Sequence, residues 1–187
     1  IAFNGEIYNH LDLRRTLEDL PSPSPSPSPS PSPSPLTPSP SPAGRRGEYL
    51  WRGHSDTETL LACFAAWGIE KTLASAVGMF AIVLWDRETR TLTLARDRMG
   101  EKPLYYGWQG DSFLFGSELK ALKAHPALKA DIDRGALALL LRYNYVPAPY
   151  SIYKGIYKLP AGTFLQVNAQ SSLTPGPSPN GRGEPTA

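Results

Sequence analysis

The spacing of apolar residues predicts helices in the first half of the chain. Leucine and isoleucine recur at near-helical spacing across residues 6–20, which favours a helix that ends at the following proline-rich run. Ser55 is a typical N-cap residue before an apolar stretch at 59–67, and Gly68 is a typical C-terminal stop. We therefore expect a second helix there and a third, short helix over residues 70–76.

The middle of the chain carries apolar runs that are typical of strands, and these lie over residues 79–85, 91–96, 104–108 and 113–116. The segments that join them are short and rich in residues that favour turns. Consecutive strands with short connections predict an antiparallel meander.

The flanking segments complete a mixed pattern. Residues 118–124 and 133–142 have helical character, and residues 162–167 form the expected last strand. The first three residues are apolar and lead into Asn4-Gly5, a dipeptide suited to a tight turn with positive φ. Because the strands are gathered together with helices before and after them, the sequence predicts an α+β layered fold rather than alternating βαβ units.

Proline usage separates two segments from this pattern. Of the 20 prolines, 11 fall in residues 21–48 and 4 in residues 173–187. Since each proline fixes φ and removes a backbone N–H, we expect residues 21–48 to be an extended or disordered insertion and residues 173–187 a disordered tail. The runs that begin at Leu36 and Leu173 are near-copies, which favours an inserted repetitive element over a ligand for proline-recognising modules. One domain would then span residues 1–172.

The charge distribution excludes some classes of partner. The net charge is +2 with no cluster of cations, which argues against binding to nucleic acid or to a membrane surface. No apolar run approaches the roughly 20 residues that span a bilayer.

Cysteine and histidine offer no metal site. The single cysteine, Cys63, excludes an internal disulfide and a multi-thiolate site, and it fits a reducing, cytoplasmic setting. It lies on an apolar stretch without a neighbouring cation, so we interpret it as a buried, inert thiol. His10, His54 and His125 lack the spacing of zinc ligands.

The residues Asn4-Gly5-Glu6 are candidates for a catalytic oxyanion hole. A side-chain amide beside a glycine N–H provides two fixed donors, which is what an oxyanion hole requires. The neighbouring Glu6 carboxylate could hold an ammonium group. The alternative from these residues alone is an ordinary turn that caps a helix.

A set of short motifs occurs in a fixed order along the chain. The motifs are Phe3-Asn-Gly-Glu-Ile-Tyr-Asn9, Ser55-Asp-Thr-Glu58, Gly78-Met-Phe-Ala81, Arg96-Asp-Arg-Met-Gly-Glu-Lys-Pro-Leu-Tyr105, Ser117-Glu-Leu-Lys120, Tyr145-Val-Pro-Ala-Pro149 and Lys158-Leu-Pro-Ala-Gly162. Together they resemble the glutaminase domain of glutamine-hydrolysing asparagine synthetases. The early motifs are shared by class II glutamine amidotransferases, and the last two are more specific to asparagine synthetases.

The resemblance implies an N-terminal-nucleophile hydrolase fold, with two antiparallel sheets between helical layers. It also implies that an N-terminal cysteine attacks the side-chain amide of L-glutamine and releases ammonia through a thioester. Asn4 and the backbone N–H of Gly5 would form the oxyanion hole, and Glu6 and Asp56 would bind the α-ammonium group of glutamine. A synthetase domain of the same polypeptide would use ATP and Mg²⁺ to amidate aspartate.

The given sequence departs from the family pattern at both ends. It contains neither the terminal cysteine, nor the arginine that binds the glutamine carboxylate, nor the S-G-G-x-D-S motif of the synthetase domain. We therefore expect an incomplete fold without its N-terminal strands, no cofactor in this part, and no glutamine hydrolysis by residues 1–187 alone. The alternatives are the glutaminase domain of another class II amidotransferase, a non-catalytic glutamine-binding remnant and a non-functional fragment. The sequence also leaves open whether the chain forms a homodimer.

Overall fold

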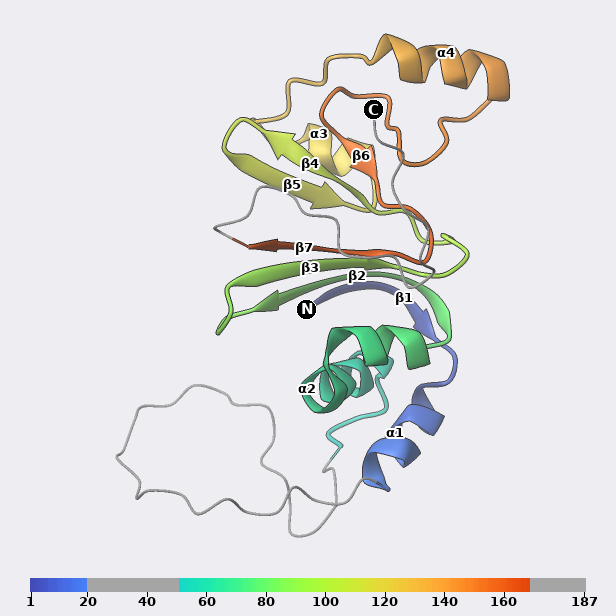
Figure 1. The fold of residues 1–187 in the computed structure, drawn as a ribbon, viewed down its shortest axis with the longest axis vertical. Helices are drawn as coiled ribbons and strands as arrows, with labels where there is room; N and C mark the ends of the chain where they lie inside the picture. Colours follow the sequence, from blue (N-terminus) through green and yellow to red (C-terminus); the bar gives the residue numbers. More distant parts are fainter. Residues whose placement is uncertain (20–50, 169–187) are drawn as a thin grey trace. The chain divides into compact units, whose positions relative to one another are not determined.

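A computed structural model describes residues 1–19 and 51–168 as an α+β protein (Figure 1). The chain divides into two compact units, which are described separately. The first contains Ile1–Ile7 with Gly78–Ala187, and the second contains Tyr8–Val77. The predicted disorder of residues 21–48 and 173–187 lies outside the described residues, and the domain boundary at residue 172 stays a prediction.

The first unit contains two antiparallel sheets. The larger sheet has the strand order β1 (Ala2–Ile7), β2 (Gly78–Asp86), β3 (Thr91–Arg96) and β7 (Phe164–Asn168). The smaller sheet has the order β5 (Ser112–Gly116), β4 (Tyr105–Gln109) and β6 (Tyr157–Lys158).

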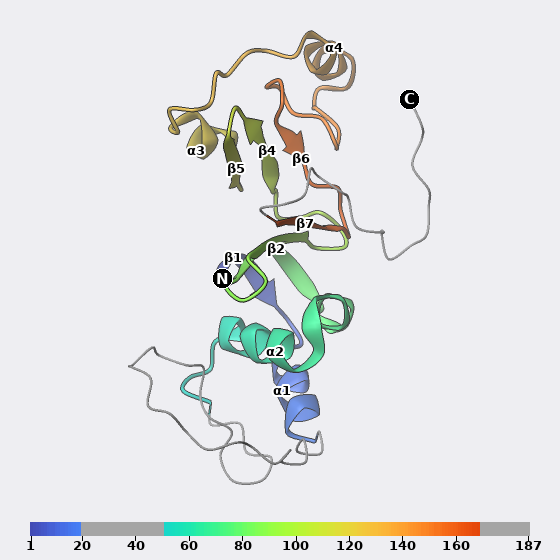
Figure 2. The ribbon, with the colours of Figure 1, turned by 60° about the vertical axis from the view of Figure 1, so that its left-hand side comes forward.

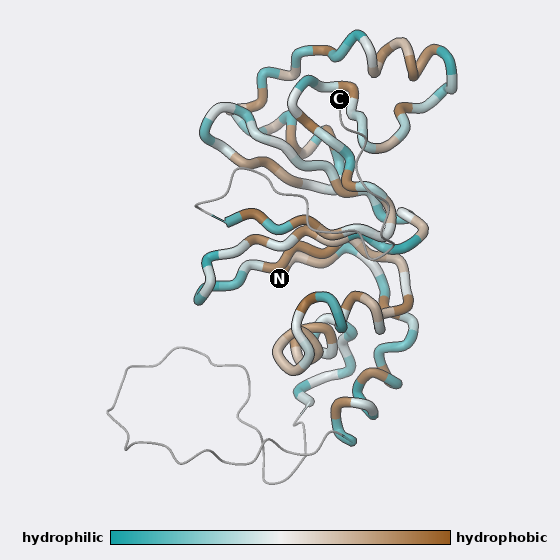
Figure 3. Tube along the Cα trace, in the orientation of Figure 1, coloured by the Kyte–Doolittle hydropathy of each residue, from teal (hydrophilic) through white to brown (hydrophobic). Residues whose placement is uncertain are grey.

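The core of this unit is built from both sheets. Leu94 and Leu165 of the larger sheet pack in one cluster with Leu104 and Leu159, and Tyr106 and Phe113 of the smaller sheet contact it. Figure 3 shows hydrophobic residues concentrated along β2 and β3, whose central positions are buried. Four consecutive residues of β2, from Phe80 to Val83, are buried, which is why this strand forms a continuous apolar run in the sequence.

The predicted meander is wrong, because β3 and β4 belong to different sheets. β3 pairs with β7 from the end of the described chain, and β4 pairs with β5 and β6. The connecting segment forms a compact loop in which Gly100 has a φ of 67° and donates its N–H to the Asp97 carbonyl at 3.1 Å. Local turn signals could not distinguish this loop from a hairpin.

The predicted turn at Asn4-Gly5 is also wrong. β1 continues through both residues to Ile7, and Gly5 lies opposite Phe80 of β2. A Cβ at Gly5 would overlap the carbonyl oxygen of Met79 and would lie 2.7 Å from the Phe80 Cα, so glycine permits close strand approach here rather than a turn. The first helix therefore begins at residue 10 and not at residue 6.

The second unit pairs α1 (His10–Glu18) with α2 (Asp56–Ser75) (Figure 2). Leu17 of α1 and Leu60 of α2 are fully buried. α2 is interrupted at Gly68, which has φ 76° and ψ −177°. The helices predicted over residues 59–67 and 70–76 are therefore confirmed as the two parts of a kinked helix.

The remaining predicted elements of the first unit are confirmed with small shifts, as α3 (Leu119–Lys123), α4 (Arg134–Tyr143) and β7. Asp133 caps α4 by accepting hydrogen bonds from the N–H groups of Gly135 and Ala136. β6 was not predicted, because its two residues form a strand only through pairing with β4. Among the helices that the structure describes, none is long and apolar enough to cross a membrane.

Candidate functional site

The Asn4-Gly5-Glu6 segment lies on β1 with its polar side chains on one face. Residues two apart in a strand point to the same side, so Asn4 and Glu6 share a face, and both are exposed. The Asn4 amide donates from Nδ2 to the Ser117 hydroxyl at 3.2 Å. This contact joins two motifs that are 113 residues apart and restrains the orientation of the amide.

Asp97 holds the strand that faces this segment. Its buried carboxylate accepts hydrogen bonds from the backbone N–H groups of Met99 (3.1 Å) and Glu101 (2.9 Å) through one oxygen, and of Phe80 (3.2 Å) and Lys102 (3.0 Å) through the other. Burial disfavours the charged form, but the backbone hydrogen bonds outweigh it and hold the pKa of Asp97 below its usual value. Since Phe80 pairs with Gly5, Asp97 supports the backbone next to the candidate oxyanion hole.

The role of Asp97 was not predicted, although this residue lies in one of the family motifs. The available signal was an aspartate directly before a glycine-containing turn, where a carboxylate can accept nearby backbone N–H groups. The bond from Phe80 links residues 17 apart, which no local pattern indicates.

Two further motifs meet at Arg96 and Lys158. The Arg96 guanidinium donates to the carbonyls of Lys102 (2.8 Å) and Leu159 (2.7 Å), which ties the loop after β3 to the segment after β6. Lys158 donates to the carbonyl of Val146 at 2.9 Å, and burial, with a contribution from the Arg96 charge, lowers its pKa. These hydrogen bonds give the Arg96 and Lys158 side chains a structural role in these motifs.

Asp56 occupies the first turn of α2. The preceding N-cap, Ser55, accepts a hydrogen bond from the Thr57 N–H at 3.2 Å, and Asp56 accepts one from the Thr57 hydroxyl at 3.4 Å. Asp56 belongs to the second unit, whereas Glu6 belongs to the first. The expectation that these two carboxylates bind the same ammonium group therefore stays a prediction.

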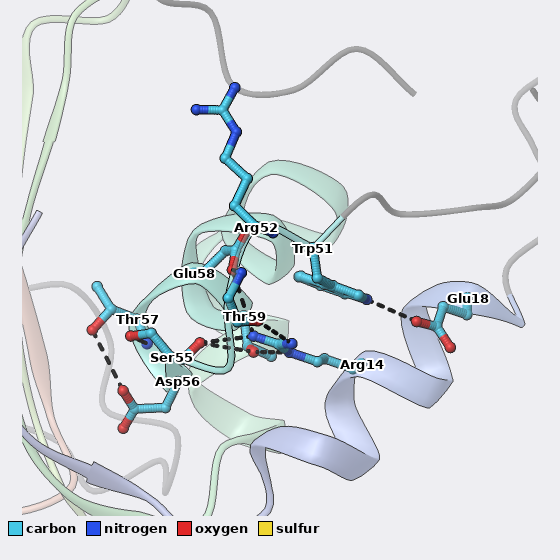
Figure 4. Close-up of polar contacts among 10 residues, drawn as sticks. Arg14, Glu18, Trp51, Arg52, Ser55, Asp56, Thr57, Glu58 and Thr59 are labelled. Carbon is cyan, nitrogen blue, oxygen red and sulfur yellow. Dashed lines mark hydrogen bonds and ion pairs between the residues drawn. The ribbon is translucent and has the colours of Figure 1, made fainter. Parts of the chain in front are cut away.

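Arg14 of α1 lies next to the segment that carries Asp56, and no sequence motif indicated a role for it. Its side chain donates to the carbonyls of Gly53 (2.8 Å) and Ser55 (2.9 Å) and to the hydroxyl of Thr59 (2.7 Å) (Figure 4). The residue is only 7% exposed. The only sequence signal was a basic residue next to the apolar positions of a helix.

Cys63 is confirmed as a core thiol. It is fully buried on α2, and desolvation raises the pKa of its thiol to about 11. At neutral pH such a thiol is protonated and is a poor nucleophile. Within residues 1–19 and 51–168, no group of three or more His, Cys, Asp or Glu side chains could hold a metal ion. The resemblance assigns ATP and Mg²⁺ to the expected synthetase domain, and that assignment stays a prediction.

Comparison with known proteins supports a common family for these motifs. The profile of the family described as "Glutamine amidotransferase domain" matches residues 45–175. The chain is 36% identical over 160 residues to asparagine synthetase [glutamine-hydrolyzing] 3 of Bacillus subtilis, with 85% of the chain and 22% of the relative covered. It is 30% identical over 174 residues to asparagine synthetase [glutamine-hydrolyzing] 1 of the same organism, with 93% and 23% covered.

A solved structure has a similar fold. The glutamine phosphoribosylpyrophosphate amidotransferase of B. subtilis, complexed with ADP and GMP, superposes with a TM-score of 0.54 at 18% identity, and the match covers 93% of this chain and 28% of that one. At this identity the likeness concerns the fold alone. The chain spans less than a quarter of the length of the two synthetases.

Proposed function

Because the chain belongs to the family of glutamine amidotransferase domains, we propose that it is the glutamine-binding part of an asparagine synthetase. The observation that carries the proposal is the β1 segment, where Asn4 and Glu6 share an exposed face on either side of Gly5. In this proposal the fold is that of the N-terminal-nucleophile hydrolases, and ammonia from glutamine would serve the amidation of aspartate elsewhere in a longer protein.

The proposed roles follow from the chemistry of the side chains. Attack on the side-chain amide of glutamine turns its carbonyl oxygen into an oxyanion, which the Asn4 amide and the Gly5 backbone N–H would stabilise as donors. The carboxylates of Glu6 and Asp56 would pair with the α-ammonium group, because charge-assisted hydrogen bonds favour a charged amine. Collapse of the oxyanion would break the amide C–N bond and release ammonia, and water would then hydrolyse the remaining acyl intermediate to glutamate.

Residues 1–187 alone are proposed to bind glutamine without hydrolysing it. Their one cysteine is buried, with a pKa raised to about 11, so it supplies no accessible thiolate. We expect no ammonia release from glutamine by these residues. Turnover that disappears in a Cys63→Ala variant would contradict this assignment.

Calorimetric titration with glutamine tests the binding site. We expect saturable binding that Glu6→Gln and Asp56→Asn each weaken about 10- to 150-fold, since a hydrogen bond to a charged group contributes about 1.5 to 3 kcal/mol. Glu88→Gln is the matched control, because it removes an exposed carboxylate in the turn after β2. A chain that gives no binding heat, or that binds equally well after both site substitutions, would refute the proposal.

A further inference from the structure

The guanidinium end of the Arg14 side chain contacts the segment that leads into α2 and the first turn of that helix (Figure 4). Nε donates to the Thr59 hydroxyl, while Nη1 and Nη2 donate to the carbonyls of Gly53 and Ser55. The guanidinium carbon lies 4.2 Å from the centre of the Trp51 ring. These partners flank Asp56 in sequence on both sides.

Glu58 strengthens the same arrangement. Its carboxylate lies 3.7 Å from Arg14 Nη2 and accepts hydrogen bonds from the backbone N–H groups of Arg52 (2.8 Å) and Gly53 (3.1 Å). The carboxylate therefore compensates the buried arginine charge and closes the turn before Ser55. Removing one partner of this buried arginine charge should lower the stability of the fold strongly, because the remaining charged and polar groups are then left unpaired.

Arg14 itself is poorly placed to bind a ligand. Each of its three guanidinium nitrogens already donates to a protein oxygen, and the residue is 7% exposed. The N–H groups of its planar guanidinium instead bind three acceptors on three different residues, Gly53, Ser55 and Thr59. Lysine, with a single ammonium group, cannot reach the same three acceptors in this geometry.

We propose that Arg14 is a positioning residue for glutamine binding: it fixes residues 51–59 in the conformation that presents Asp56 to the α-ammonium group. The inference rests on the proposed function, since it assigns Asp56 to the ammonium group. It adds that α1, which lies before the proline-rich insertion in the sequence, determines the geometry of a binding residue that lies after it.

Hydrogen exchange tests the ordering of the segment without any ligand. In the full 187-residue chain, Arg14→Lys is expected to raise amide exchange in residues 51–59 at least tenfold and to leave the amides of β2 and β3 unchanged. Arg15→Lys is the matched control, because Arg15 is the next residue on α1 and its side chain is 74% exposed. Equal exchange in the two variants would overturn the proposal.

Calorimetry with two ligands then separates positioning from general destabilisation. We expect Arg14→Lys to weaken glutamine binding about tenfold, and to change less than twofold the binding of the glutamine analogue that lacks the α-amino group. In an Asp56→Asn background, Arg14→Lys should weaken glutamine binding less than twofold further, because Asp56 is already lost. Equal weakening of both ligands, or additive effects of the two substitutions, would overturn the inference.

Thr59→Val provides a second variant in case Arg14→Lys does not fold. It removes the acceptor of Arg14 Nε together with the long hydrogen bond, 3.4 Å, that the Thr59 hydroxyl donates to the Ser55 carbonyl, and it nearly preserves the side-chain shape. The same selective loss of glutamine affinity is expected, and its absence counts against the inference. If the unsubstituted chain does not bind glutamine, the proposed function and this role both fail; if it binds but neither variant alters affinity, only this inference fails.

Discussion

Replacing Asp97 by asparagine should destabilise the first unit strongly. Each carboxylate oxygen accepts two backbone N–H groups, so the NH₂ group of asparagine must face two of these four donors. An unsatisfied buried donor costs about 1 to 3 kcal/mol, which gives a loss of about 2 to 6 kcal/mol. Domains are usually stable by about 5 to 15 kcal/mol, so the substitution removes a large share of the total.

The same residue makes a prediction about pH. The pKa of Asp97 is lowered in the folded protein, because backbone hydrogen bonds overcome the effect of burial. The stabilisation is therefore complete above the unfolded pKa of about 3.9 and is lost as the pH falls through the lower, folded pKa. The unsubstituted chain should lose stability below about pH 4, and Asp97→Asn should lack this part of the pH dependence.

Urea unfolding followed by tryptophan fluorescence and circular dichroism, between pH 3 and pH 7, measures both effects. Asp86→Asn is the control, because Asp86 also accepts two backbone N–H groups, from Glu88 and Thr89, but is fully exposed. The reasoning is refuted if Asp97→Asn costs no more than Asp86→Asn at pH 7. It is also refuted if both variants keep the acid-dependent slope of the unsubstituted chain.

Two further substitutions and one labelling experiment test other parts of the structure. Gly5→Ala should lower the unfolding free energy by at least about 2 kcal/mol more than Gly110→Ala. Both glycines have positive φ, but only a Cβ at residue 5 would overlap the Met79 carbonyl oxygen. Equal losses of stability in urea unfolding would contradict this prediction. Cys63 should react with a thiol reagent at pH 8 only on the timescale of unfolding, and rapid labelling of the native chain would exclude its burial. Asp133→Ala should cost about 1 kcal/mol by removing the N-cap of α4, whereas unchanged helix protection in hydrogen exchange would argue against the cap.

The sequence predicted those elements whose signals are local. β3 has the predicted bounds of residues 91–96, and the end of the first part of α2 at Gly68 follows from a residue that adopts positive φ readily. Pairing between strands could not be predicted in this way. Asn-Gly is a typical turn dipeptide, yet at Asn4-Gly5 the pairing with β2, more than 70 residues later, determines the conformation.

In the candidate site too, local motifs could be predicted from the sequence and long-range contacts could not. The motifs included Asn4, Asp56, Asp97 and Ser117, but the hydrogen bonds around these residues could not be predicted from the sequence. Ser117, Asp97 and Arg14 act through hydrogen bonds to partners that are 17 to 113 residues away. Such contacts have no periodic signal, so only a three-dimensional structure reveals them.

The contact between Trp51 and α1 has a consequence for engineering. The indole N–H donates to the Glu18 carboxylate at 2.7 Å, and Arg14 lies over the same ring, so residues on either side of the 20–50 segment are joined directly. Closing a connection between two points that already meet costs only about 0.6 kcal/mol for each doubling of its length. This position is therefore a suitable place to insert a reporter domain inside the chain at a small cost in stability.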